Sequence, residues 1–100
     1  MDNYGRRCCD TFRFKQGIKV SEARQRYIFS VSRMYKELSA EDKKKIKDLC
    51  VKAGGEYSEA LFEFVTTDAG STAITMRHYL SRSTLCRIVK KYYENFPDKI

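Results

Sequence analysis

Apolar side chains recur every three or four residues through most of the chain, which is the spacing of one face of an α-helix. The first such stripe predicts a helix over about residues 22–38, capped by Ser21. A second helix is predicted from its cap residue Ser39 to Gly54, which offers the left-handed conformation that ends a helix. A third follows in EYSEALFEFVTTD, whose wide apolar face predicts contact with more than one neighbour.

The C-terminal part of the chain predicts two helices joined by a tight turn. A short helix is expected at about 72–78 and a longer one at about 82–95, with Tyr79, Leu80 and Ser81 between them. No partner strand is evident for the short alternation in TFRFK, so the prediction is an all-α bundle of four to five helices. The residues expected to share its core are Ile28, Val31, Leu49, Leu61, Phe64, Ile74, Leu85 and Ile88.

The length of 100 residues suits one domain and is too short for two domains with separate cores. We therefore expect a single domain over 1–100. Within it, a basic N-terminal arm over 1–20 precedes a helical core over 21–70, and the helical pair occupies 71–96.

The charge is distributed unevenly along the chain. Residues 1–36 hold nine Lys or Arg against three acids, residues 37–68 hold five against eight, and residues 69–100 hold six against two. Two basic ends around an acidic middle fit a surface that faces a polyanion, although Lys and Arg that merely solvate helix faces fit the count equally well. The arginines of the arm are Arg6, Arg7 and Arg13.

Little in the sequence points to catalysis, a metal or a cofactor. The cysteines are Cys8, Cys9, Cys50 and Cys86. They form no CxxC pair, and His78 is the only histidine, so no zinc site is expected. A Gly-rich phosphate loop and a nucleophile elbow are both missing, which argues against an enzyme. No signal peptide or apolar span is evident, so we expect a cytoplasmic protein without a membrane partner.

The segment STAITMRHYLSRSTLCRIVKKYYENFP resembles the helix-turn-helix superfamily of bacterial and phage regulators over residues 71–93. The likeness is strongest in LSRSTLCRIVKK, which has the usual turn and recognition-helix pattern with Ser at the cap. The sequence departs from that pattern at Tyr79, where Gly is usual, and at His78, where a leucine-like residue is usual. Because a bulky residue takes a positive φ only at a cost, these departures predict a looser turn.

The resemblance implies an all-helical DNA-binding unit with two classes of contact residue, chosen among the positions that face away from the predicted core. The residues expected to contact bases are Arg82, Ser83 and Arg87. The residues expected to contact the DNA backbone are Thr72, Arg77, Thr84, Lys90 and Lys91. Arg6, Arg7 and Arg13 of the arm are expected to reach the adjacent minor groove.

The expected function is sequence-specific binding of double-stranded DNA by a small transcriptional regulator of bacterial or phage origin. Such regulators pair on DNA, and the shared surface of a homodimer is expected at Tyr92, Tyr93 and Phe96 or at the apolar edge of helix 22–38. One alternative is a protein-interaction module, such as a phage-encoded inhibitor of a nucleic-acid enzyme. Another is a binder of RNA or single-stranded DNA, in which the tyrosines stack on bases. A third is a helical hairpin that only builds core.

Overall fold

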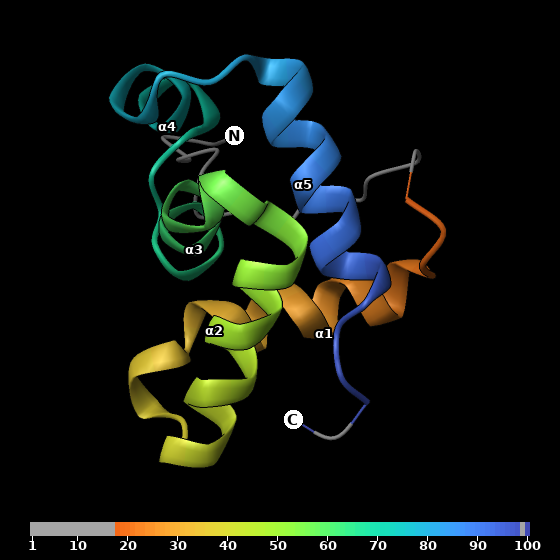
Figure 1. Cartoon of the computed structure of the whole chain (residues 1–100). Helices are drawn as coiled ribbons and strands as arrows, with labels where there is room; N and C mark the ends of the chain where they lie inside the picture. Colours follow the sequence, from red (N-terminus) through yellow and green to blue (C-terminus); the bar gives the residue numbers. More distant parts are fainter. Residues whose placement is uncertain (1–17, 99) are drawn as a thin grey trace, which may run out of the picture.

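The computed structural model describes residues 18–98 and 100. Within them every regular element is helical, which confirms the all-α prediction (Figure 1). The elements are α1 (Glu22–Arg33), η2 (Tyr35–Glu37), α2 (Ala40–Gly54), η3 (Gly55–Tyr57), α3 (Ser58–Thr66), α4 (Ser71–His78) and α5 (Arg82–Glu94). The predicted contacts of Arg6, Arg7 and Arg13 lie outside the described residues.

Serine side chains start three of the helices, as their positions in the sequence predict. The Ser21 hydroxyl accepts the Arg24 N–H at 3.2 Å at the start of α1, and Ser39 accepts the Asp42 N–H at 3.2 Å in α2. Ser81 does the same for α5. Each hydroxyl satisfies one of the N–H groups that the first turn of a helix leaves without a partner.

Two helix ends differ from the prediction. The helix expected over 22–38 stops at Arg33 and continues as the 3-10 turn Tyr35–Glu37. The second helix includes Gly54, and the positive φ of 56° belongs to Gly55. Gly54 is buried against α3, where a Cβ would lie in van der Waals contact with the side chain of Leu61 at 3.4 Å.

The helices pack around a shared core to which each of α1 to α5 contributes. Figure 1 shows α5 running beside α2, and α2 packs in turn on α3. The short helix α4 contacts both α3 and α5. The apolar side chains with the least exposure are Ile28, Ile46, Leu61, Ile74 and Tyr92. The core thus braces the α4–α5 pair from two sides.

Most of the predicted core is buried, with two corrections. Val31 and Phe64 are only half-buried at the edge of the core, and Val65 takes the inward position on α3. On α1 the buried position next to Ile28 is Gln25, a polar residue. Its side-chain amide donates to the Val20 carbonyl at 3.0 Å, which offsets the cost of its burial.

The aromatic cluster at the end of α5 belongs to the core and leaves no exposed pairing surface. Tyr92, Tyr93 and Phe96 are all buried, which corrects the prediction that their exposed part is shared between two copies. The Tyr92 ring lies edge-on to Phe96 with centroids 5.6 Å apart, and its hydroxyl is 2.6 Å from the Ser32 hydroxyl. These residues point inward because their rings pack against apolar neighbours and because the Tyr92 hydroxyl has a hydrogen-bond partner.

Three buried groups in this core make stability fall in alkali. Burial raises the pKa of the Cys50 thiol from 9.0 to about 12, and burial raises the pKa of Tyr93 from 10.0 to about 12. Burial also raises the pKa of Tyr92 well above its usual value. The folded chain therefore keeps protons that the unfolded chain has lost, so the stability that these groups contribute is fully present below about pH 9 and declines above it. Each ionising group contributes a slope of about 1.4 kcal/mol per pH unit.

Urea unfolding between pH 8 and pH 11, followed by circular dichroism, measures this decline. The variant Cys50→Ala is expected to lose the part of the slope that begins near pH 9, because the thiol ionises in the unfolded chain before either tyrosine does. The exposed Cys86 supplies the matched control, since Cys86→Ala removes a thiol that lies outside the core. An equal slope in wild type and Cys50→Ala would show that desolvation of the thiol has no thermodynamic consequence.

Candidate nucleic-acid interface

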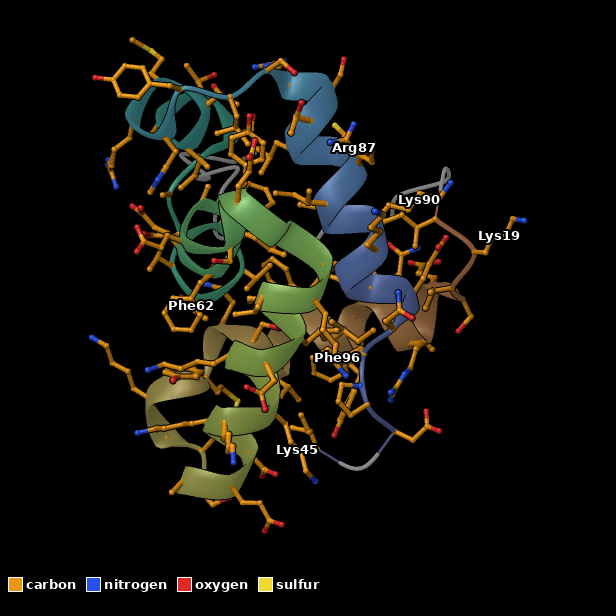
Figure 2. The ribbon with its side chains drawn as sticks, in the orientation of Figure 1. Lys19, Lys45, Phe62, Arg87, Lys90 and Phe96 are labelled. Carbon is orange, nitrogen blue, oxygen red and sulfur yellow. The ribbon has the colours of Figure 1, made fainter. Side chains whose placement is uncertain are left out.

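The exposed side of α5 carries a single stripe of polar residues, which we call the outer stripe. It consists of Ser83, Arg87, Lys90 and Glu94. These positions follow the i, i+4, i+7, i+11 spacing of one helix face, opposite the buried Leu85, Ile88 and Tyr92. Figure 2 shows Arg87 and Lys90 projecting from the same side of α5. Two long cations and one hydroxyl thus share a face.

The C-terminal end of the outer stripe is acidic. Glu94 accepts the backbone N–H of Lys19 at 3.1 Å, which ties the segment before α1 to the end of α5. Ser83 lies eleven residues earlier, about 16 Å away along the helix axis at 1.5 Å per residue. The cations of the outer stripe, Arg87 and Lys90, therefore lie in the middle of α5, between Ser83 and Glu94.

Arg82 lies beside the outer stripe and contacts α4. Its guanidinium donates to the Thr72 hydroxyl at 3.1 Å, a bond that crosses from one helix to the other. Thr72 was predicted as a backbone contact and Arg82 as a base contact, and the structure joins the two. This bond to Thr72 fixes the direction of the Arg82 side chain, which is otherwise exposed to solvent.

The turn before α5 is closed by two hydroxyl side chains. The Thr84 N–H donates to the Ser81 hydroxyl oxygen at 3.1 Å, and the Ser81 hydroxyl donates to the Thr84 hydroxyl at 2.9 Å. Because Thr84 accepts that bond, its own hydroxyl proton is left to donate outward. Thr84, predicted as a backbone contact, therefore also rigidifies the start of α5.

Arg77, another predicted backbone contact, forms an ion pair with Glu63 of α3. The ring of His78 meets the same carboxylate, with Nε2 2.8 Å from Oε1. Glu63 thus holds the end of α4 against α3 and partly neutralises Arg77. Sequence reasoning missed Glu63, because it lies 15 residues before His78 and carries no local signal.

Lys91 points away from the outer stripe. One residue along a helix is a rotation of 100°, and this takes Lys91 to the side of α5 that faces α2. There it lines a groove of about 540 Å³ together with two lysines of α2, Lys45 and Lys52. The predicted backbone contacts Lys90 and Lys91 therefore belong to different surfaces. The two α2 lysines share one helix face at i and i+7, and sequence reasoning assigned them no site.

The turn between α4 and α5 depends on a tyrosine in an unusual conformation. Tyr79 has φ 57° and ψ 50°, the left-handed region, and its N–H donates to the Thr75 carbonyl as a helix-ending bond. The Leu80 N–H donates to the same carbonyl at 3.1 Å. Tyr79 therefore takes the left-handed conformation that Gly usually supplies at the end of a helix. The connection between α4 and α5 is three residues long, so it is tight and not loose as predicted. Its side chain is 90% exposed.

Replacing Tyr79 by glycine is expected to raise the free energy of unfolding by up to about 1 kcal/mol, because a side chain in the left-handed region costs about 1–2 kcal/mol and glycine avoids most of that. Tyr79→Ala is the matched control, since it removes the ring but keeps the Cβ. We expect the glycine variant to be the more stable of the two in thermal or urea unfolding. Equal stability of the two variants would show that the backbone at 79 is unstrained.

Other kinds of site find no support in the part of the chain that the structure describes. Over residues 18–98 and 100 no three metal-binding side chains come together. None of the helices found there has the length and apolar character needed to cross a membrane. Comparison with family models, with curated proteins and with solved structures finds no match to this chain. The α4–α5 pair is therefore the candidate functional site.

Proposed function

We propose that the protein binds double-stranded DNA sequence-specifically, with α4 and α5 as a helix-turn-helix and α5 as the recognition helix. The observation that carries this proposal is the three-residue connection between α4 and α5, followed by a helix whose outer stripe is basic and exposed. In this motif the second helix enters the major groove while the first braces it across the DNA backbone. With 13 residues, α5 is about 20 Å long, and an α-helix fits the 12 Å width of that groove.

The proposed roles follow the chemistry of each side chain. Arg87 and Arg82 present guanidinium groups, which read guanine by two parallel hydrogen bonds, and Ser83 adds a small donor near the start of α5. Lys90 is a point charge suited to phosphate, and Thr84 has a hydroxyl proton to donate. Recognition helices use their N-terminal residues for base contacts. This agrees with the position of Glu94, the acid of the outer stripe, at the C-terminal end of α5.

The contacts proposed for α4 are to the DNA backbone. Thr72 can donate its hydroxyl proton to a phosphate while its oxygen accepts from Arg82. Arg77 contacts phosphate more weakly in this proposal, because Glu63 already shares its charge. Lys91 reaches only the flank of a bound duplex, since it lines the groove beside α2.

We further propose that the protein is a small transcriptional regulator that pairs on DNA, with half-sites about one helical turn, roughly 34 Å, apart. Of the two pairing surfaces predicted, the edge of α1 remains, where Ala23, Tyr27 and Met34 are all exposed. Arg6, Arg7 and Arg13 keep their proposed place in the minor groove. Sedimentation of the protein with and without a duplex measures the stoichiometry.

A protein-interaction module is the second candidate, and one observation favours it. Met76 is 72% exposed and Tyr79 is 90% exposed, three residues apart on the same end of α4. Large apolar side chains held in water are a feature of surfaces that contact other proteins. Under this alternative the exposed C-terminal end of α4 contacts the partner protein, and the cations of the outer stripe on α5 bind an acidic surface of that partner.

A gel shift with duplex DNA, single-stranded DNA and RNA at two salt concentrations separates these functions. Rounds of selection from a random duplex pool first supply a preferred sequence. Preference for duplex, with log affinity falling by about 0.9 per phosphate contact for each log unit of salt, supports the proposal. Preference for a single strand or RNA would overturn it in favour of base stacking. Absence of binding at low salt would favour the protein-interaction module.

A further inference from the structure

The groove between α2 and the end of α5 is separate from the outer stripe. It is lined by Lys45, Asp48, Leu49, Lys52, Ala53, Lys91, Asn95 and Pro97. The α2 members are spaced i, i+3, i+4, i+7 and i+8, so a single face of that helix forms one wall. The other wall is the last turn of α5 and the residues after it. Figure 2 shows Lys45 on α2, on the side where the chain leaves α5.

The charge of the groove is positive. Three lysines line it against one carboxylate, that of Asp48, which leaves an excess of two positive charges at neutral pH. The lysines come from both walls, two from α2 and Lys91 from α5. The positive charge of the groove therefore comes from two helices that are far apart in the sequence. Charge of one sign along a concave surface concentrates ions of the opposite sign.

The side-chain acceptors on the lining of the groove are Asp48 and Asn95. The Asn95 side-chain amide donates to the Lys91 carbonyl at 2.9 Å, beside the Asn95 backbone N–H at 3.1 Å. That bond fixes the amide group of Asn95 and leaves its oxygen as the free acceptor. The Asp48 carboxylate and the Asn95 oxygen suit hydroxyl or amino groups of a ligand.

The floor and the size of the groove indicate more than a bare ion. Leu49 and Ala53 are buried beneath it, and Pro97 lies at its rim. Its volume of about 540 Å³ falls within the range of roughly 300–1,000 Å³ that is typical of sites for small organic ligands. A ligand that combines an anionic group, hydroxyl groups and an apolar part matches this lining.

We infer that this groove binds the phosphate group of a nucleotide, with the phosphate between Lys52 of α2 and Lys91 of α5 and the sugar hydroxyls toward Asp48. The nucleotide is either free in solution or part of a polynucleotide, and both present the same chemistry to the groove. The inference does not require that the outer stripe of α5 reads DNA bases.

Titration of the full chain with adenosine monophosphate, adenosine and inorganic phosphate, followed by amide NMR shifts, tests the inference. We expect adenosine monophosphate to shift the amides of residues 45–53 and 91–97 and to bind more tightly than either fragment. Lys52→Ala and Lys91→Ala should each weaken that binding about two- to fivefold, the effect of removing one exposed charge. Asp48→Asn keeps an oxygen that accepts from the sugar hydroxyls and removes the negative charge that repels phosphate, so it should tighten binding by a similar factor.

Lys47→Ala is the matched control, because it removes an exposed lysine of α2 that does not line the groove. Losses as large for Lys47→Ala as for Lys52→Ala would overturn the inference, as would shifts confined to the outer stripe or equal binding of adenosine. The same groove variants, assayed on a short duplex, identify the source of the phosphate. An effect on duplex binding indicates a polynucleotide, and an effect on adenosine monophosphate alone indicates a free nucleotide. If the groove variants weaken binding of neither the duplex nor adenosine monophosphate, the groove is not a site for nucleotide phosphate.

Discussion

Leu61→Ala is expected to lower the free energy of unfolding by about 2–5 kcal/mol. Leu61 has no exposed surface and lies in the middle of α3, the helix that packs on α1, α2, α4 and α5. Its side chain also lies next to Gly54 of α2. Removal of three carbons there leaves a cavity that neighbouring helices cannot close without separating from one another.

Urea unfolding monitored by circular dichroism measures that loss. Val51→Ala is the matched control, because Val51 is apolar, helical and 60% exposed on α2. We expect it to change stability by less than about 0.5 kcal/mol. A loss below about 1 kcal/mol for Leu61→Ala would mean that α3 does not lie at the centre of the core.

The starts of the helices could be predicted from sequence more accurately than their ends. A capping serine acts on the N–H group three residues later, so Ser21 and Ser39 carried their own local signal. The end of α1 depends on a distant contact instead. The 3-10 turn after Arg33 places Tyr35 edge-on to Phe62 of α3, with ring centroids 4.9 Å apart. No pattern within residues 22–38 contains that partner.

The candidate site shows the same division between local and distant determinants. Helical spacing alone implies that Ser83, Arg87 and Lys90 share a face and that Lys91 departs from it. Which element lies next to Lys91 could not be known, because α2 and α5 are far apart in sequence and meet only in the folded chain. The ion pair of Arg77 with Glu63 also depends on how α3 and α4 pack. Sequence reasoning therefore found the cations and missed their partners.

Arg87→Ala is expected to weaken binding to a preferred duplex by about 1–3 kcal/mol, roughly five- to 150-fold, and to weaken binding to random duplex much less. Arg87 lies in the middle of the outer stripe, one turn beyond Ser83, where a recognition helix faces the base edges. Lys90→Ala should instead weaken binding to all duplexes about equally, because a phosphate contact carries no sequence information.

Arg87→Lys separates charge from geometry at this position. Lysine keeps the positive charge and hence the attraction to phosphate, but it lacks the planar fork that makes two parallel bonds to guanine. We expect Arg87→Lys to retain nearly all binding to random duplex and to lose most of the preference for the selected sequence. Fluorescence anisotropy with both duplexes at fixed salt gives the two affinities, and Lys44→Ala on the exposed side of α2 serves as the charge control. If Arg87→Ala, Arg87→Lys and Lys90→Ala all change the two affinities by the same factor, α5 contacts only the DNA backbone and the specificity must come from another part of the chain.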